Sequence, residues 1–555
     1  MTRLLPRPAE LGLRHHLLLA LVALVLYLPG FAGLPPFDRD ESRYAQASRQ
    51  MLESGDFVDI RFQEEARHKK PVGIYWMQSA SVRLLTGGGS EGPIWMYRVP
   101  SLLGAVAAVL LTASAGARLF GAAAGMAAGL ALASALVLGV EARMAKTDAV
   151  LLATVVAVQG ALARFYLDRD KPVPPGLGWV LAFWGAAGLS ILVKGPIVLM
   201  VTGTTMLALG LADRRWDWLR LLRPGIGVPV LLAVVLPWLA AIWVRTDGAF
   251  FSYAIGHEFL GKANTGQESH GGPPGYYLAT VWLSFWPWTP LVALALPWMW
   301  RRRGDAAVRF CLAWALPTWV VFELVVTKLP HYTLPVFPAL AMLAAAATLE
   351  RHDGPRPRSR WGFWAVAVIW SAVTLGFAGV AAYLPVAVNG VPSITGALAA
   401  AAILATGAAA LLYEHQREPE RLLASLVAGA LATYGTVHGL LLPGLDQVWL
   451  SPRVAETVER LRPCPGTVLA AAGYTEPSMV FLVGTGTRLG GADTVAAHLA
   501  GDPACALGLV TARELSAFQA AAGALGIEVR QVAGLRGFNY SRGKWEDLGF
   551  YRAGP

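Results

Sequence analysis

Residues 227–244 read GVPVLLAVVLPWLAAIWV and contain no charged side chain. An α-helix of this length rises about 27 Å, which is close to the ~30 Å hydrocarbon core of a bilayer. Comparable apolar stretches recur from the N-terminus to about residue 443, so the sequence predicts an α-helical polytopic membrane protein with about 13 spans. The predicted spans are 16–34, 98–117, 121–140, 149–167, 177–193, 196–212, 227–244, 277–299, 306–327, 332–349, 362–384, 394–413 and 421–443.

The composition supports this class. Of the 555 residues, 55% are hydrophobic and 15% are charged, whereas soluble domains carry about 25% charged residues. The net charge of +10 could indicate nucleic-acid binding. However, the Arg and Lys residues form short clusters between apolar stretches, which is the pattern of membrane topology, and nucleic acid is excluded as a partner.

The basic clusters also orient the chain. If the N-terminus is cytoplasmic, alternate loops are Arg-rich, as the positive-inside rule requires. These loops contain Arg118 and the segments 168–171, 213–223, 301–303, 351–360 and 417–421. The first loop, 35–96, then lies outside, and an odd number of spans places the C-terminal segment outside as well. We therefore expect a multi-pass protein of the bacterial inner (plasma) membrane, with its functional loops facing the periplasm.

The segment 444–555 differs in kind from the rest of the chain. Short β-like runs at 467–470 and 479–483 and a helical pattern at 512–525 predict a small α/β domain. We therefore divide the chain into a transmembrane domain, 1–443, and a C-terminal periplasmic domain. A periplasmic location permits a disulfide between Cys464 and Cys505, although two cysteines alone do not establish one.

The first outside loop begins with an unusual concentration of charge. Residues 36–45 read PFDRDESRYA, which places three acids and two arginines within six residues at the end of a span. The sequence then suits an amphipathic helix along the interface. One interpretation is a solvated turn. The other is a site in which Asp40 or Glu41 takes a proton from an acceptor or binds a metal, while Arg43 holds a phosphate.

Other candidates lie in the remaining outside segments. Charges at the membrane edge are costly and usually functional, so their location on one predicted side indicates a single site. Headgroup anchoring, an N-cap role for Asp148 and a snorkelling Lys194 are the structural alternatives. The candidates are Lys70 in RHKKPVGIYW (67–76), Arg143 and Asp148 in EARMAKTD (141–148), Lys194, His257 and Lys262 in the loop 245–276, and Lys328 and Tyr332 in TKLPHYTLP (327–335).

The absence of three motifs narrows the possible chemistry. The sequence has no H-E-x-x-H zinc-protease motif and no Walker A or dinucleotide-binding fingerprint. A soluble nucleotide donor is therefore not indicated, and a donor carried by a lipid explains why none is needed.

In these motifs the sequence resembles the bacterial glycosyltransferase family 39/83, which includes the aminoarabinose transferases of lipid A and, more distantly, the protein O-mannosyltransferases. The resembling pieces are FDRDESRYA (37–45), MLESGD (51–56), Lys70-Pro71 with Tyr75-Trp76, 143–148, KGP (194–196) and KLPHYTLP (328–335). The resemblance implies a GT-C fold and a polyprenyl-phosphate sugar donor. It also implies transfer at the periplasmic face to lipid A, another lipid or a glycan, and less to protein, by a monomer among membrane lipids.

The resemblance also implies roles. Asp40 is a base or metal-site candidate and Asp148 is a second acid. Lys194 lines the pocket, and Lys262 stands where the aminoarabinose transferases have an arginine. The predicted phosphate-binding residues are Arg43, Tyr44, Lys70 and Tyr332.

One departure concerns the metal. The transferases carry an acid just before Lys-Pro, whereas this chain has Lys69, preceded by His68. A divalent metal ion would then depend on Asp40 and His68.

The alternative function is a transporter or flippase for a lipid-linked substrate. It predicts pseudo-symmetric halves with broken helices, whereas the charges in this sequence gather at one membrane edge.

Overall fold

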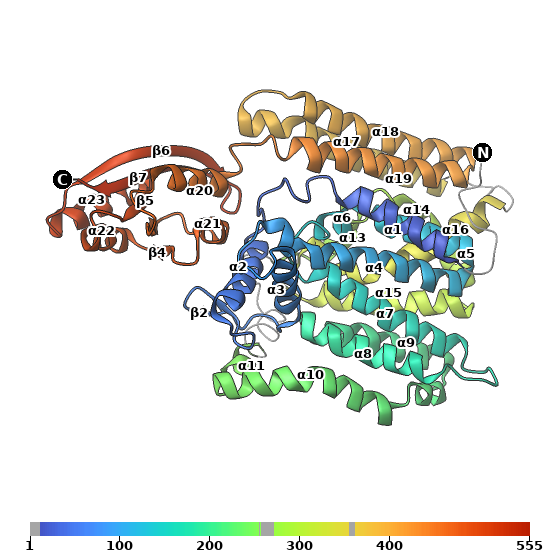
Figure 1. Ribbon diagram of the computed structural model, residues 1–555. Helices are drawn as coiled ribbons and strands as arrows, with labels where there is room; N and C mark the ends of the chain where they lie inside the picture. The colour runs from blue at the N-terminus through green and yellow to red at the C-terminus, as the bar shows by residue number, and fades with distance from the viewer. Residues whose placement is uncertain (1–10, 255, 257–270, 354–360, 555) are drawn as a thin grey trace.

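A computed structural model describes residues 11–254, 256, 271–353 and 361–554 (Figure 1). The predicted site residues His257 and Lys262 lie outside this range. The elements before the C-terminal unit are α1 (Leu13–Tyr27), α2 (Arg39–Ser54), β1 (Arg61–Phe62), β2 (Glu65–Ala66), α3 (Gly73–Leu85), α4 (Ile94–Phe120), α5 (Ala122–Ala133), α6 (Leu136–Glu141), α7 (Asp148–Leu167), α8 (Leu177–Lys194), α9 (Ile197–Asp213), the 3-10 helix η1 (Asp217–Leu222), α10 (Pro224–Thr246), α11 (Ala249–Tyr253), α13 (Tyr276–Ser284), α14 (Thr289–Arg302), α15 (Ala306–Leu324), the 3-10 helix η4 (Pro330–Val336), α16 (Phe337–Asp353), α17 (Trp361–Asn389), α18 (Ile394–Gln416), α19 (Pro419–Thr436) and a π-helical turn (Val437–Leu441).

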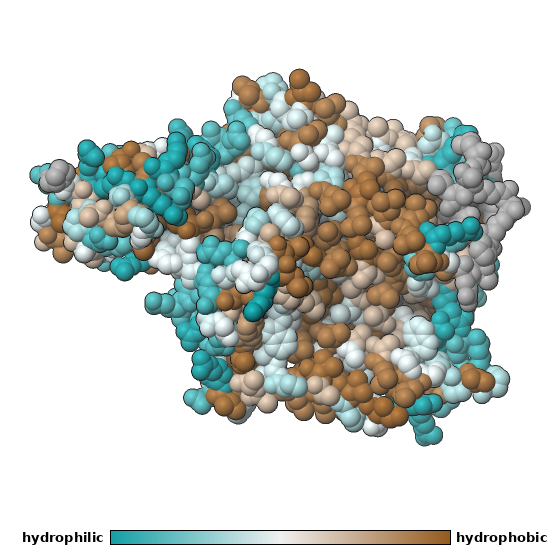
Figure 2. Space-filling view, viewed as in Figure 1, coloured by the Kyte–Doolittle hydropathy of each residue, from teal (hydrophilic) through white to brown (hydrophobic). Residues whose placement is uncertain are grey.

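The chain up to about residue 442 is a helical bundle of membrane-protein character. Among the described residues, nine helices are long and apolar enough to cross a bilayer, and α1, α5 and α9 are shorter apolar helices. Figure 2 shows an apolar band across the bundle, with polar residues towards both ends. The predicted polytopic helical fold is confirmed, while the number of spans stays a prediction.

The bundle interior is formed by α4, α5, α7 and α16, which pack against one another. The share of buried residues is 83% in the α16 span but only 22% in α10. Sequences such as AAAGMAAG at 122–129 supply the small side chains that allow membrane helices to approach closely. The exposed apolar side chains of α10 are therefore suited to contact the lipid chains of a bilayer.

Two predicted spans are each two helices, which corrects the sequence-based boundaries. The prediction 121–140 is interrupted at Ser134–Ala135. The prediction 277–299 is interrupted between α13 and α14, where Pro287 lacks a backbone donor. The two breaks face each other: Trp288 Nε1 donates to Ser134 Oγ at 2.9 Å, and the Leu136 amide donates to the Trp286 carbonyl at 3.0 Å. These bonds compensate the interrupted helix ladders inside the bundle.

The C-terminal unit is a five-stranded sheet between helices (Figure 1). The strand order is β4-β3-β5-β7-β6, in which β4, β3 and β5 are parallel and β7 pairs antiparallel with β5 and β6. Helices α20 and α21 cover one face, and α22 and α23 cover the other. The elements are α20 (Leu450–Leu461), β3 (Leu469–Ala472), α21 (Pro477–Val483), β4 (Arg488–Gly490), α22 (Ala492–Gly501), β5 (Leu507–Thr511), the 3-10 helix η6 (Ala512–Glu514), α23 (Leu515–Ala524), β6 (Val529–Asn539) and β7 (Lys544–Ala553).

The small C-terminal α/β unit is present as predicted, with one local error. Residues 479–483, predicted as a strand, lie in helix α21. A short, fully buried apolar run does not distinguish strand from helix, and Pro477 in the first turn favours a helix. Cys464 and Cys505 form a disulfide.

Candidate active site

Asp40 is held by the first turn of α2. The carboxylate of Asp38 accepts hydrogen bonds from the backbone amides of Asp40 and Glu41 at 2.6 and 3.2 Å, and so caps the helix. The Asp40 side chain is 49% exposed, and its Oδ1 lies 3.4 Å from guanidinium nitrogens of both Arg43 and Arg67. Asp40 is therefore a solvent-accessible carboxylate between two arginines.

These cations control the charge of Asp40. Desolvation by the surrounding protein opposes ionisation. However, the positive charges of Arg67, Lys146, Arg43 and Lys70 outweigh it and hold the pKa of the Asp40 carboxyl well below its usual value. Asp40 is thus a carboxylate at any physiological pH. The Arg67 guanidinium also lies over the Tyr44 ring, 5.2 Å from its centroid.

The neighbouring acid, Glu41, points into the protein and is fully buried. Arg98 donates to Glu41 at 2.7 and 3.2 Å and to the carbonyls of Phe31 and Leu34 at 2.8 and 2.7 Å. The amide of Ala145 also donates to Glu41, at 3.0 Å. The predicted catalytic candidate Glu41 thus joins α2 to two other segments instead of facing the exposed carboxylate.

Asp148 begins α7 and faces a lysine. The Lys194 Nζ lies 2.5 Å from Asp148 Oδ1 and 5.5 Å from the centroid of the Tyr332 ring. The N-cap residue of α7 is Thr147 and no side-chain cap bond is present, so the N-cap alternative for Asp148 is wrong. The side chain is instead part of a buried ion pair that connects α7 with the end of α8.

Two glycines bring these helix ends together. Gly195, with φ of 73° and ψ of −150°, ends α8 directly after Lys194 in a conformation that favours glycine. At Gly73, which begins α3, a Cβ atom would lie 2.7 Å from the Leu192 carbonyl oxygen. The close approach of α3 to α8 places the loop that contains Lys70 near the end of α8.

Lys146 connects the two acid-bearing segments. Its Nζ lies 3.6 Å from Asp38 Oδ2 and 3.4 Å from Glu141 Oε1, and the residue is 6% exposed. Burial lowers the pKa of Lys146, but the neighbouring carboxylates of Glu141 and Asp38 raise it far more, so the lysine stays charged. Both Asp40 and Asp148 act electrostatically on Lys146 and on Tyr44. We call Asp38, Asp40, Glu141, Lys146, Asp148, Lys194 and His331 the charged cluster.

Three members of the charged cluster could hold a metal ion. Donor atoms of Glu141, Asp148 and His331 all lie within 4.8 Å of one another. His331 lies 3.6 Å from Glu141 and 3.8 Å from Asp148. Glu141 Oε2 is buried and has no hydrogen-bond partner within the described parts of the chain. Burial, together with the charges of Asp148 and Asp38, raises the pKa of Glu141.

Three other predicted residues have separate partners. Arg143 is fully buried, donates to the Pro29 carbonyl at 2.7 Å, and lies 5.3 Å from the centroid of the Tyr434 ring. Lys328 donates to the Gly272 carbonyl at 3.0 Å. His68 Nε2 lies 2.9 Å from Asp59 Oδ1, so His68 and Asp40 have different ionic partners.

Several residues of the site were not among the sequence-based candidates, namely Asp38, Arg67, Arg98, Glu141, Lys146 and His331. Most of them lie inside the quoted motifs, but the sequence does not show which of several adjacent charged residues faces the site. Arg98 begins a predicted span, and the high cost of a charge in that position is the signal that could have found it.

Charged residues also gather at the opposite end of the bundle. Asp168, which follows α7, pairs with Arg118 at the end of α4 and lies 2.7 Å from Lys171. Arg351 and Glu414 pair at 2.7 Å. The Arg-rich loops and the charged cluster therefore occupy opposite ends of the helices, as alternation predicted.

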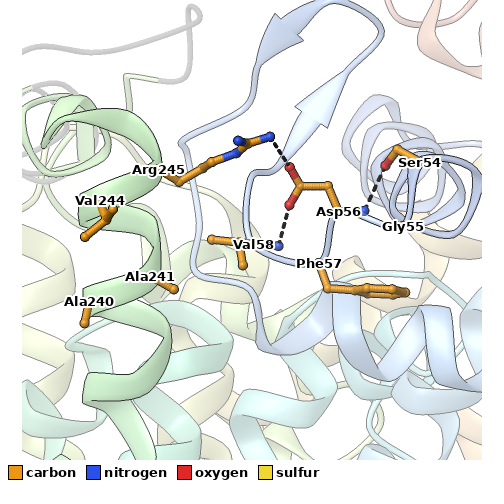
Figure 3. Close-up of a pocket in the computed structure, with 9 residues that line it drawn as sticks. All are labelled: Ser54, Gly55, Asp56, Phe57, Val58, Ala240, Ala241, Val244 and Arg245. Carbon is orange, nitrogen blue, oxygen red and sulfur yellow. Dashed lines mark hydrogen bonds and ion pairs between the residues drawn. The ribbon is translucent and has the colours of Figure 1, made fainter.

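A cleft of 870 Å³ lies apart from the charged cluster, between the end of α2 and α10 (Figure 3). Ala240, Ala241 and Val244 of α10 form one wall, and Asp56 pairs with Arg245 across the cleft at 3.2 Å. Among the predicted site residues that the structure describes, none lines this cleft.

The sequence is similar to those of known sugar transferases. The family model described as dolichyl-phosphate-mannose-protein mannosyltransferase matches residues 69–243. An undecaprenyl phosphate-alpha-4-amino-4-deoxy-L-arabinose arabinosyl transferase from Edwardsiella ictaluri is 29% identical over 59% of this chain and 58% of its own length. The Pseudomonas aeruginosa enzyme of the same name is 30% identical over 56% of this chain and 55% of its own. The matched region therefore spans less than two thirds of these relatives.

Solved structures extend the likeness to the whole fold. The crystal structure of ArnT from Cupriavidus metallidurans bound to undecaprenyl phosphate superposes with a TM-score of 0.72 at 22% identity, over 96% of this chain and 97% of the other. The Archaeoglobus fulgidus oligosaccharyltransferase in its apo form gives 0.53 at 12% identity, over 94% and 69%. The chain thus has the GT-C fold that its motifs predicted.

Proposed function

We propose that the protein is an integral-membrane glycosyltransferase that moves a sugar from a polyprenyl-phosphate donor to an acceptor facing the periplasm. The observation that carries the proposal is the charged cluster, in which an exposed carboxylate, Asp40, and a buried Asp148–Lys194 pair lie at one end of the bundle. The relatives are named for an undecaprenyl-phosphate-linked sugar, and the Cupriavidus structure is described with undecaprenyl phosphate.

The cations suit a phosphate leaving group. When the bond between the sugar C1 and the phosphate oxygen breaks, negative charge develops on the phosphate, and positioned cations stabilise it. Lys194 and Lys70, with the Tyr332 ring beside Lys194, are proposed to hold the departing lipid phosphate, together with Lys262. The sugar C1 then carries oxocarbenium character and bonds to the acceptor oxygen.

Asp40 is proposed to act on the acceptor. Its depressed pKa makes it a weak base in the resting enzyme. It is therefore suited to orient the acceptor hydroxyl by accepting its hydrogen bond, and to receive the proton as the bond from the acceptor oxygen to C1 forms. Asp148, already neutralised by Lys194, is proposed to fix that lysine towards the phosphate.

The predicted divalent ion is proposed to bind at Glu141, Asp148 and His331. The oxygen and nitrogen donors are of the types that divalent cations use, and the unpartnered Glu141 oxygen is available to one. Such an ion would supply additional positive charge to the leaving phosphate. His331→Ala should reduce the metal content of the purified protein from near one ion per chain to near zero, measured by mass spectrometry after dialysis. Equal content in the two proteins would place the ion elsewhere.

The remaining proposals concern location. The positive-inside pattern supports an inner-membrane protein with the charged cluster and the C-terminal unit in the periplasm, acting as a monomer. The proposed division is a transmembrane domain, 1–443, and a periplasmic domain, 444–555. Lipid A, another lipid or a glycan is the proposed acceptor class.

The test uses the full chain in nanodiscs with an undecaprenyl-phosphate-linked sugar and lipid A, and follows product formation by mass spectrometry. Asp148→Asn should lower turnover about 100-fold or more, which is the typical effect of losing one stabilising group. Asp168→Asn, which alters a buried acid at the other end of α7, is the matched control and should retain activity. Equal turnover in the two variants would refute a site at the charged cluster.

A further inference from the structure

We propose that the C-terminal unit positions the catalytic segments, through Glu476 and Phe481. This inference rests on the proposed function and assigns the C-terminal unit a part in it. Figure 1 shows α21 of this unit beside α2, the helix whose first turn carries Asp40.

Glu476 makes the first contact between the C-terminal unit and α2. It is 4% exposed, its Oε2 lies 3.2 Å from Arg39 Nε, and its Oε1 accepts a hydrogen bond from Asn539 Nδ2 at 3.2 Å. Arg39 stands between the capping residue Asp38 and the exposed Asp40. One buried carboxylate therefore connects the end of β6 with the beginning of α2.

Thr485, just after α21, forms a second set of contacts farther along α2. Its hydroxyl accepts from Gln46 Nε2 at 2.7 Å and donates to Glu53 Oε2 at 2.9 Å. Its carbonyl accepts from Gln63 Nε2 at 3.1 Å. Contacts near both ends of α2 fix the rotation of the helix about its axis, and with it the direction of Asp40.

Phe481 belongs to a buried apolar cluster that includes residues of both acid-bearing segments. Its ring is 4% exposed, packs edge-on against Tyr97 at 5.3 Å, and belongs to one buried cluster with Ala45 of α2 and Ala145. Ala145 precedes Lys146, which bridges Asp38 and Glu141. Removing the ring from this cluster should therefore alter the spacing between α2 and the segment 141–148.

These contacts matter because α2 is not a bundle helix. It packs mainly on α3, β1 and α21, so the C-terminal unit covers a face that would otherwise meet water. Misplacing a catalytic group by about 1 Å can cost about 100-fold in rate. Glu476 and Phe481 are thus positioning residues that touch no substrate.

The test compares Phe481→Ala, Phe481→Leu and Glu476→Gln in the full chain. We expect Phe481→Ala to lower kcat about 10- to 100-fold, while KM for the undecaprenyl-phosphate sugar stays within about threefold because the lysines that hold phosphate are unchanged. Phe481→Leu, which keeps part of the apolar volume, should restore part of kcat. Glu476→Gln should also lower kcat. Its matched control is Glu456→Gln, which changes an exposed acid on α20 and should leave kcat unchanged.

Hydrogen exchange gives a readout independent of activity. Phe481→Ala should speed amide exchange in 39–54 and 141–148. Phe518→Leu, in the core on the other face of the sheet, should affect only the C-terminal unit. Unchanged kcat, or faster exchange confined to 450–553 in Phe481→Ala, would overturn the inference. Absence of transfer by the unaltered protein would instead count against the proposed function, and the exchange data would still test the positioning.

Discussion

The adjacent acids Asp40 and Glu41 should respond to substitution in opposite ways. Glu41→Gln leaves the Arg98 charge without a full ionic partner in a site with no solvent exposure, and breaking a buried pair costs about 3–5 kcal/mol. Asp40→Asn removes two longer ion pairs, each of 3.4 Å, from a half-exposed carboxylate. An exposed pair contributes about 0.2–1 kcal/mol, and the pair with the buried Arg67 should cost less to break than the Glu41–Arg98 pair because water reaches the Asp40 side. Glu41→Gln should therefore destabilise the protein more, and Asp40→Asn should abolish transfer in a stably folded protein.

The assay is the thermal unfolding midpoint of the purified full chain in detergent, together with turnover per folded molecule. The double variant Glu41→Met with Arg98→Met should be less destabilised than the sum of the single variants, because neither charge is left alone. A Glu41→Gln protein as stable as the unaltered one but without turnover would show that Glu41 belongs to the chemistry, and the structural role would be refuted.

Three further results are expected. Lys146→Met should lower kcat about 10- to 100-fold by releasing the spacing of the acid-bearing segments, measured by steady-state kinetics. Arg67→Met should let the pKa of Asp40 rise towards its usual value near 3.9, so the acid loss of activity in a pH–rate profile should begin at higher pH than in the unaltered protein. Replacing Cys464 and Cys505 by serine should destabilise the C-terminal unit by about 4 kcal/mol from loop entropy, given their separation of 41 residues, measured by thermal unfolding.

For each of these three predictions, one outcome would contradict the reasoning. Lys171→Met at the opposite end of the bundle controls for loss of a lysine. Equal kcat in the two lysine variants would show that the contacts of Lys146 with Asp38 and Glu141 do not matter for catalysis. For the pH profile, the sign follows from the depressed pKa of Asp40: its charge stabilises the fold above the ordinary pKa and is lost only as pH falls through the lower folded value. If the pH–rate profiles of Arg67→Met and the unaltered protein coincide on the acid side, Arg67 does not control the pKa of Asp40. A serine pair with unaltered unfolding would mean that the disulfide does not constrain the unit.

The lengths of the apolar stretches predicted most of the helical fold, because apolar length is a local property that the bilayer enforces. The residues 227–244 and the helix α10 nearly coincide. The breaks within 121–140 and 277–299 were missed because Ser134 and Trp288 compensate each other only in three dimensions. The strand predicted at 479–483 was wrong because a short apolar run fits either secondary structure.

The candidate site was predictable by segment but not by side chain. The motifs 37–45, 141–148 and 328–335 were identified, yet adjacent acids in the first motif point in different directions. The sequence could not show that Glu41 faces Arg98 while Asp40 stays exposed. It also could not show that Lys146 connects two motifs about a hundred residues apart, since they meet only where the beginning of α2 contacts the segment 141–148.

The contact between α21 and α2 has a consequence for biosynthesis. Domains generally fold in order as the chain emerges, yet α2 acquires its last partner from residues made more than four hundred positions later. In the proposed orientation, that partner must also cross the bilayer before it can dock. A nascent or truncated chain without α21 would hold all its spans and still lack the contacts proposed to position α2, so full activity would have to wait until synthesis is complete.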